Sequence, residues 1–146
     1  MLVEQMGLVE ELKRLWTMPF TTTDEALTAF RTTYADPVSV NGVDVSVTEL
    51  VERATAMQRA FAGLEPEVIE HVESGEHLVL VFWQRGRHVG VLETALGMIE
   101  PTGRRIEVRV IDVLSINDGR ISQIQVVPDN LAMLMQLRAV RLADVR

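Results

Sequence analysis

The spacing of apolar residues in the first part of the chain predicts three helices. In residues 3–17 the apolar side chains recur at intervals of three and four, which places them on one helical face. A second helix is expected to begin at the Thr22–Glu25 pair and a third at the Ser46–Glu49 pair, because each pair has the spacing of a capping box. Gly63 is expected to end the third helix. The sequence thus predicts three helices ahead of the first long strand.

Beyond Pro66 the pattern changes to alternation and short apolar runs, which is typical of strands. The runs read EVIEHVE, HLVLVFWQ, RHVGVLE, RRIEVRVIDVLSI and RISQIQVV, and turn-forming pairs such as Ser74-Gly75 and Arg85-Gly86 separate them. Strands joined by short turns form antiparallel hairpins, and helices gathered at the front of the chain must then cover one face of the sheet. We therefore expect an α+β fold with an antiparallel sheet, in one domain spanning residues 1–146.

Composition and charge narrow the range of partners. The chain of 146 residues has a formal net charge of −7 and scattered arginines, so it would repel a phosphate backbone, and nucleic acid is not expected. No apolar run approaches the ~18 residues of a spanning helix, and the first residues carry acids where a signal peptide would be basic. We therefore expect a cytoplasmic protein without membrane contact. The chain has no cysteine, and its histidines are not spaced for a metal site.

The strand around Asp112 raises the first chemical question. Side chains alternate along a strand, so Val108, Val110, Asp112 and Leu114 share one face. A carboxylate among apolar neighbours is costly when ionised, and its pKa should rise until the neutral acid persists as a hydrogen-bond donor. The alternative is that Asp112 faces solvent at a curved edge or forms a structural ion pair with Arg109 or Arg87.

Three other residues allow both a structural and a chemical interpretation. Asp129, at the junction between an apolar strand and a helix-like Leu/Met pattern, either caps that helix or takes part in catalysis. Asp36 precedes Pro37, where it either starts a turn or lies at the mouth of a pocket. His88 is either a strand-surface residue or a proton-transfer partner.

Several linked motifs resemble one family. The segments GRHVGVL, PTGRRI, INDGRI and VVPDNLAMLMQL match, in order and spacing, the C-terminal half of the SnoaL-like polyketide cyclases over about residues 78–137. The resemblance implies the conical α+β fold shared with nuclear transport factor 2 and ketosteroid isomerase. In that fold a curved antiparallel sheet wraps on three helices as a conical barrel around an apolar pocket, and homodimers are common.

The same resemblance implies roles for the aspartates. Asp129 matches the aspartate of the cyclase WPD motif, an acid/base that moves a proton in an intramolecular aldol closure. Asp112 stands where those cyclases have a pocket histidine, but VIDVLSINDGRI is similar to the ketosteroid isomerase segment whose aspartate stays protonated and donates to an oxyanion. Asp36 lies in DPV, similar to the segment that holds that isomerase's base. The isomerase's oxyanion tyrosine has no counterpart in the first helix, which offers Trp16.

We expect from this sequence a cyclase or isomerase of secondary metabolism that acts on an apolar polyketide-like or steroid-like carbonyl compound through an enolate. The candidate acid/base residues are Asp112, Asp129 and Asp36, and neither a metal nor an organic cofactor is expected. The residues expected to line the pocket are His88, Trp83, Tyr34, Trp16, Phe30, Val110, Leu114 and Val126.

Two alternatives remain open at this point. An aspartate pair could instead open an epoxide, as an epoxide hydrolase or a cyclic-ether-forming enzyme does, although Val126 argues against the limonene epoxide hydrolase type of site. The chain could also be a non-catalytic binding or dimerisation module of the same fold. The resemblance also implies a homodimer, and the apolar outer face that contains Ile111 and Val113 is of a kind that usually needs covering.

Overall fold

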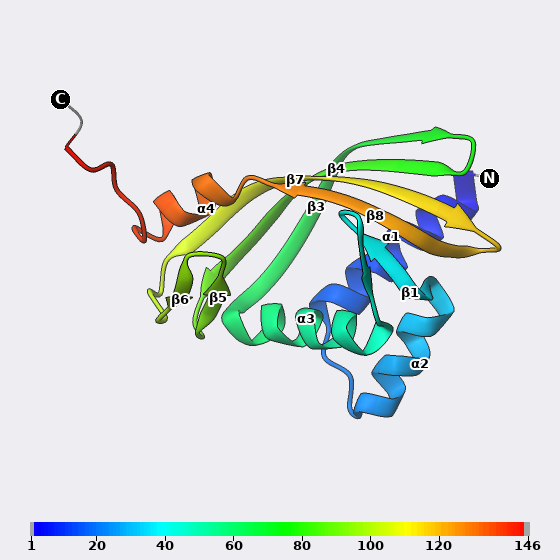
Figure 1. Ribbon diagram of the computed structural model, residues 1–146, viewed down its shortest axis with the longest axis horizontal. Helices are drawn as coiled ribbons and strands as arrows, with labels where there is room; N and C mark the ends of the chain where they lie inside the picture. The colour runs from blue at the N-terminus through cyan, green and yellow to red at the C-terminus, as the bar shows by residue number, and fades with distance from the viewer. Residues whose placement is uncertain (1, 145–146) are drawn as a thin grey trace.

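The computed structural model describes residues 2–144, with side chains from Gly7 onward. In chain order its elements are α1 (Leu2–Thr17), α2 (Thr23–Thr33), β1 (Tyr34–Val40), β2 (Val43–Val45), α3 (Val47–Ala60), β3 (Phe61–Ser74), β4 (His77–His88), β5 (Leu92–Thr94), β6 (Gly97–Ile99), β7 (Arg105–Asn117), β8 (Arg120–Pro128) and α4 (Asn130–Gln136). The long strands form a curved sheet, and α1, α2 and α3 gather on one side of it, as Figure 1 shows. The expected α+β fold with a curved sheet is confirmed.

The main sheet has six strands in the order β2-β1-β8-β7-β4-β3. Neighbouring strands are antiparallel except β1 and β8, which run parallel, so the sheet is mixed and not purely antiparallel as predicted. In the described part of the chain this sheet does not close into a barrel, and β5 and β6 form a separate two-stranded hairpin. The cone expected from the resemblance is therefore open on one side.

The two capping boxes begin helices where the sequence predicts them. The Thr22 side chain accepts a hydrogen bond from the backbone N–H of Glu25 at 3.1 Å, and the Ser46 hydroxyl accepts one from the N–H of Glu49 at 3.1 Å. These bonds satisfy backbone donors that the first helical turn leaves free. The starts of α2 and α3 are thus fixed by local sequence.

Three details differ from the sequence prediction. Two short strands, β1 and β2, lie between α2 and α3, where the sequence predicts no strand. The pairing of β1 with β8 shifts its register between Tyr34 and Ser39, and Pro37 lies in this interval. Gly63 lies inside β3 and does not end α3, which stops at Ala60. Gly86 is not in a turn but inside β4.

The close approach of β3 explains the glycine at position 86. A Cβ atom added to Gly86 would lie 3.3 Å from the Phe61 Cβ and 3.4 Å from the Ala62 carbonyl oxygen. The first distance is tighter than most Cβ atoms allow, so glycine lets the start of β3 pack closely on β4.

Buried apolar side chains form two clusters. The first lies between the sheet and α1, α2 and α3, and includes Leu15, Phe30, Leu50 and Leu114. The second lies towards α4 and the β5–β6 hairpin, and includes Phe61 and Ile106 among others. Phe82 and Val126 pack against both clusters, so the two are continuous across the inner face of the sheet.

Candidate active site

Asp112 lies on the inner face of the sheet, in the middle of β7. Its register partners are Leu80 on β4 and Val126 on β8. Val110 and Leu114, two positions away on the same strand, are buried on the same face. The alternation of the strand therefore places this carboxyl where the sequence predicts it, among aliphatic side chains.

The carboxyl of Asp112 is largely removed from water. Its Oδ1 atom is buried and has no hydrogen-bond partner among the described residues. Burial raises the pKa of Asp112 from its ordinary value to about 7, because the charged form loses solvation. The structural alternative of an ion pair with a neighbouring arginine does not apply, since the Arg109 guanidinium lies over the Trp83 ring and Arg87 donates to the Gly103 carbonyl oxygen. Near neutral pH this group can both accept and donate a proton.

An aromatic cluster lies next to Asp112. The indole N–H of Trp16 donates a hydrogen bond to the Tyr34 hydroxyl oxygen at 2.8 Å, and the Phe30 ring stacks on the Tyr34 ring with centroids 5.8 Å apart. Burial above all raises the pKa of Tyr34, the Trp16 hydrogen bond opposes this, and the nearby charge of Asp112 adds to the rise. Tyr34 is therefore neutral, and because its oxygen accepts from Trp16, its own O–H remains a donor.

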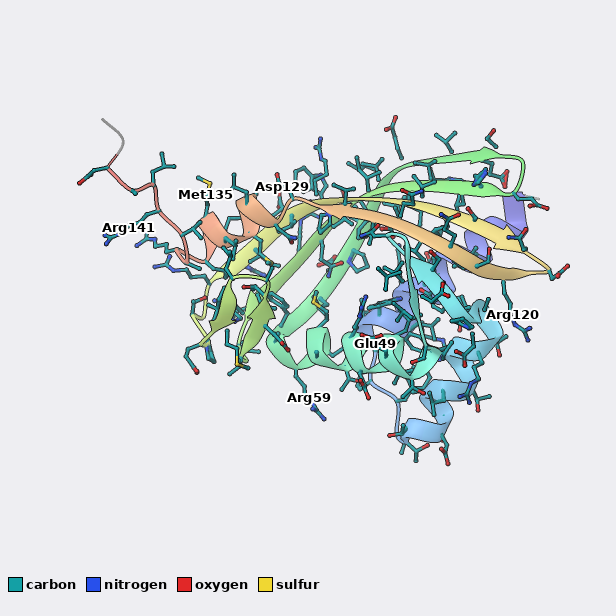
Figure 2. All side chains as sticks on the ribbon, viewed as in Figure 1. Glu49, Arg59, Arg120, Asp129, Met135 and Arg141 are labelled. Atoms are coloured by element: carbon teal, nitrogen blue, oxygen red, sulfur yellow. The ribbon has the colours of Figure 1, made fainter. Side chains whose placement is uncertain are left out.

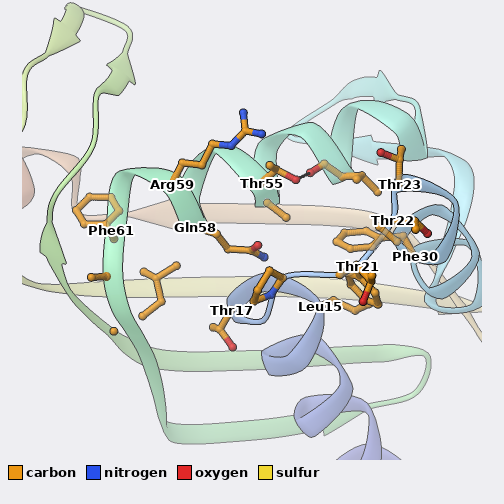
Figure 3. A pocket seen from close by; sticks show the side chains of 18 residues that line it. Leu15, Thr17, Thr21, Thr22, Thr23, Phe30, Thr55, Gln58, Arg59 and Phe61 are labelled. Atoms are coloured by element: carbon orange, nitrogen blue, oxygen red, sulfur yellow. Dashed lines mark hydrogen bonds between the residues drawn. The ribbon is translucent and has the colours of Figure 1, made fainter.

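A pocket of about 570 Å³ opens between the end of α1, the loop that leads to α2, the α3 helix and the start of β3 (Figure 3). Its lining combines a rim rich in hydroxyl groups with an apolar wall. The rim residues are Thr17, Thr21, Thr22, Thr23, Thr55 and Gln58, and the apolar wall includes Leu15, Phe20, Phe30, Val51, Ala54 and Phe61. The described residues that line this pocket do not include Asp112.

Asp129 lies at the start of α4, where its exposed side chain caps the helix. Its Oδ1 accepts a hydrogen bond from the backbone N–H of Ala132 at 3.1 Å. Figure 2 shows Asp129 well separated from Glu49 and Arg59 on α3. The capping interpretation is therefore what the structure describes, whereas the acid/base role implied by the family resemblance stays a prediction.

Asp36 also holds a helix start. Its Oδ1 accepts a hydrogen bond from the backbone N–H of Val47, the first residue of α3, at 3.2 Å, and its Oδ2 lies 3.5 Å from the Arg31 Nε. The side chain is 38% exposed, and it links the end of α2 to the beginning of α3. Of the three candidate aspartates, Asp112 is the one in an apolar interior.

His88 is fully buried, and its ring packs against Phe61 of the second cluster. The backbone N–H of Thr102 donates to its Nδ1 at 3.1 Å, which assigns the ring proton to Nε2, and the Phe61 ring lies 5.6 Å away. Nε2 is buried without a hydrogen-bond partner among the described residues. The interpretation of His88 as a strand-surface residue is wrong, and its side chain lies apart from the Tyr34 cluster.

Trp83 is not in the interior. It pairs in register with Arg109, and the Arg109 guanidinium lies 4.5 Å from the Trp83 ring centroid. Both residues point to the face of the sheet opposite Asp112, because they occupy odd positions in strands whose inner residues include Phe82 and Val110. The expectation that Trp83 lines the pocket is thus corrected.

Of the other residues expected to line a pocket, Phe30 lines the pocket beside α3, whereas Tyr34, Trp16, Val110, Leu114, Val126 and His88 do not. Val110, Leu114 and Val126 flank Asp112 in the sheet, and Trp16 and Phe30 contact Tyr34 beside it. Their role in binding a substrate stays a prediction. Sequence reasoning missed the threonines and Phe20 at the pocket. The run Thr21-Thr22-Thr23 between two helices carried a signal, because an exposed loop with so many hydroxyls can supply hydrogen bonds to a ligand.

Between residues 2 and 144, no three or more His, Asp or Glu side chains cluster in a way that could hold a metal ion. Over the same part of the chain, no helix is long and apolar enough to cross a membrane.

Solved structures with the same fold include proteins from several bacteria. TsrD from Streptomyces laurentii superposes with a TM-score of 0.78 at 21% identity, covering 94% of this chain and 97% of that one. IdmH from Streptomyces antibioticus gives 0.69 at 20% identity, covering 90% and 96%. A SnoaL-like polyketide cyclase from Agrobacterium tumefaciens gives 0.69 at 16% identity, covering 88% and 93%. At these identities the likeness shows the fold alone.

Sequence comparison identifies the family. A search of curated proteins finds no match to this chain. The family model of the SnoaL-like polyketide cyclases, in contrast, matches residues 10–137, which include every long strand of the sheet and all three candidate aspartates. The chain therefore belongs to the SnoaL-like polyketide cyclase family.

Proposed function

We propose that this protein is an enzyme that moves a proton α to a carbonyl group of an apolar substrate, with Asp112 as the acid/base. Membership of the SnoaL-like polyketide cyclase family supports a cyclase- or isomerase-type activity on a small molecule. The observation that carries the proposal is the inward-facing Asp112 carboxyl, buried without a partner for Oδ1 among the described residues and with a pKa raised by burial to about 7. Such a group exchanges protons readily at neutral pH.

The proposed reaction begins with the ionised form of Asp112. The carboxylate takes a proton from the carbon next to the carbonyl, the C–H electron pair becomes the new C=C bond, and the carbonyl π pair moves to oxygen. Tyr34 donates its O–H hydrogen bond to this enolate oxygen, and Trp16 orients the Tyr34 hydroxyl through the 2.8 Å bond. The apolar surroundings strengthen that hydrogen bond because water does not compete for it.

Two outcomes share this enolate. In a double-bond shift, protonated Asp112 returns the proton to a different carbon. In an aldol closure, the enolate carbon attacks a second carbonyl of the same molecule and Asp112 protonates the resulting alkoxide. Neither outcome changes the overall oxidation state of the substrate, so the reaction balances without a redox partner.

Proton exchange on a simple ketone tests the proposal without knowledge of the natural substrate. The apolar bicyclic ketone 2-tetralone is incubated with the protein in D₂O, and loss of its α-proton NMR signal is followed over time. We expect Asp112→Asn to lower the catalysed rate by roughly 10²–10⁴-fold, the usual contribution of general acid–base catalysis. Asp129→Asn is the matched control, because asparagine still caps a helix and the rate should change little.

Other results would support the alternatives. If Asp129→Asn abolishes exchange and Asp112→Asn does not, the acid/base is Asp129, as the family motif implies. Binding of 2-tetralone without exchange above the buffer rate by any variant would favour a non-catalytic binding module. Ring opening of cyclohexene oxide to a diol, with no ketone exchange, would favour epoxide chemistry.

We further propose that the protein forms a homodimer through the outer face of the sheet. Apolar side chains are exposed along this face and on α4, among them Ile111 (41%), Val127 (68%) and Met135 (61%). Ile111 and Val127 are register partners, so they form a continuous apolar surface of the kind that usually needs covering.

Solution mass tests the dimer directly. Ile111→Asp should convert a dimer to a monomer in light scattering coupled to size exclusion. Val43→Asp is the control, because Val43 is 64% exposed on β2, outside this surface. A monomeric parent protein at micromolar concentration would contradict the proposal.

A further inference from the structure

The pocket does not reach the Asp112 carboxyl. The pocket of about 570 Å³ opens beside α3, and the described residues lining it do not include Asp112 or Tyr34. A substrate that reaches Asp112 from this pocket must pass whatever lies between them. A residue that lines the pocket and also contacts the cluster around Tyr34 and Asp112 therefore controls which substrates reach the carboxyl.

Phe30 is such a residue. Its ring lines the pocket, where it is visible in Figure 3, and it also stacks on the Tyr34 ring at 5.8 Å. On the pocket side the Phe20 ring packs edge-on against it, with ring centroids 6.5 Å apart. The Trp16 ring also packs edge-on against it, with ring centroids 6.0 Å apart. Phe30 is 1% exposed, so its ring is enclosed between the other residues of the pocket wall and the Tyr34 ring.

Phe61 provides a comparison within the same pocket. It lines the pocket and is 2% exposed, close to the value for Phe30. Its ring, however, packs against the His88 ring, with ring centroids 5.6 Å apart, and Phe61 belongs to the second cluster. Two phenylalanines of equal size and burial thus line one pocket, and one of them stacks on the tyrosine beside Asp112.

We propose that Phe30 is a specificity-determining residue, whose ring separates the pocket from the Asp112 carboxyl and sets the size of the ring system that can reach it. This inference rests on the proposed function, because it assigns Phe30 to the reaction of Asp112. A planar ring can turn about its side-chain bonds and give its place against Tyr34 to a substrate ring. Close packing on both sides limits how far it moves, which discriminates against larger substrates.

Two ketones of different size test this proposal. The deuterium exchange of 2-tetralone and of acetone is measured for the parent protein, Phe30→Leu, Phe30→Trp and the control Phe61→Leu. Leucine is used in place of alanine because its branched side chain refills part of the space of the ring and leaves a smaller cavity in the core. We expect the 2-tetralone-to-acetone ratio of kcat/KM to rise on the order of 10-fold in Phe30→Leu and to fall similarly in Phe30→Trp. Phe61→Leu enlarges the same pocket without opening a way to Tyr34, so it should change kcat/KM for both ketones in the same proportion and keep their ratio.

A second readout does not require turnover. The pKa of Asp112, followed by carboxyl ¹³C NMR, should fall towards the ordinary aspartate value in Phe30→Leu, because water then reaches the carboxyl. The Phe61→Leu variant should keep the parent pKa. An unchanged ketone ratio in both Phe30 variants, together with an unchanged Asp112 pKa in Phe30→Leu, would overturn the role of Phe30.

The two proposals fail in different ways. If the parent protein exchanges neither ketone, the proposed function is wrong, while the Asp112 pKa in Phe30→Leu still shows whether the ring separates the carboxyl from the pocket. If the parent exchanges both ketones but the Phe61 variant changes their ratio as strongly as the Phe30 variants do, catalysis stands and the specific role of Phe30 does not.

Discussion

Asp112 and Asp129 are close in the topology and opposite in environment. Asp112 pairs in register with Val126, while Asp129 directly follows Pro128, the partner of Val110. Yet Asp112 points into the apolar interior without a partner for Oδ1 among the described residues, whereas Asp129 is exposed and accepts a backbone hydrogen bond. Whether an aspartate faces the apolar interior or the solvent, more than its place in a sequence motif, decides whether its carboxyl is suited to proton transfer.

The largest expected effect is on the stability of the protein as the pH rises from about 4 to about 7. Burial raises the pKa of Asp112 in the folded protein from its ordinary value of 3.8 to about 7, so between these values the native state holds a proton that the unfolded chain has released. The free energy of unfolding therefore falls as pH rises through this range, by up to about 4 kcal/mol. Asp112→Asn has no proton to lose, so relative to the parent it should gain about 3 kcal/mol between pH 5 and pH 8.

Urea unfolding of the two proteins at both pH values measures this difference. Asp129→Asn serves as the control, and its stability relative to the parent should not change between pH 5 and pH 8 by a comparable amount. Parallel pH profiles for the parent and Asp112→Asn would mean that Asp112 ionises freely, and the contrast between the two aspartates would disappear.

A smaller effect is expected at the aromatic side of the Asp112 site. Tyr34→Phe removes the acceptor of the Trp16 N–H, and an unpaired, partly buried donor costs about 1–3 kcal/mol. Chemical unfolding of Tyr34→Phe, Trp16→Phe and the double variant gives the coupling between the two side chains. The double variant should lose less than the sum of the single losses. Strict additivity would show that the 2.8 Å contact contributes nothing to the site.

Much of the fold was predictable because local chemistry determines it. The capping boxes at Thr22 and Ser46 predicted two helix starts, and alternation along β7 predicted the inward face of Asp112. β1 was not predicted, because Pro37 and its neighbours do not form an apolar run. Its strand depends on the parallel pairing with β8, a contact between distant parts of the chain.

The candidate site was predictable in part for the same reason. Trp83 was misplaced because the run from Leu78 to Trp83 is apolar on both faces, so its pattern does not say which face is buried. For Asp129, the same local sequence fits both a helix cap and a catalytic aspartate, and only the burial of the side chain in the folded protein distinguishes the two. The pocket rim near Thr21 arises from a loop and two helices that meet in the folded chain.

The cap at Asp129 gives a modest and specific prediction. Asp129→Ala removes the acceptor of the Ala132 N–H and should cost about 1 kcal/mol of unfolding free energy. Asp129→Asn should stay within a few tenths of a kcal/mol of the parent, since asparagine caps helices equally well. Urea unfolding at pH 5 distinguishes the two. Equal losses in both variants would show that the charge of Asp129, and not its capping geometry, stabilises the protein.

The smallest effect is expected at Asp36, the third candidate aspartate. Its ion pair with Arg31 is 3.5 Å long, and both side chains are well exposed, at 38% and 52%. Exposed pairs of this kind are worth about 0–1 kcal/mol and are screened by salt. Arg31→Gln should therefore lower the unfolding free energy by less than about 1 kcal/mol at low salt, and the loss should vanish at 1 M NaCl. A loss that persists at high salt would mean that Arg31 stabilises the protein through packing and not through its charge. The hydrogen bond from the Val47 N–H to Asp36 would then be the main polar contact that distinguishes Asp36 from Asp112.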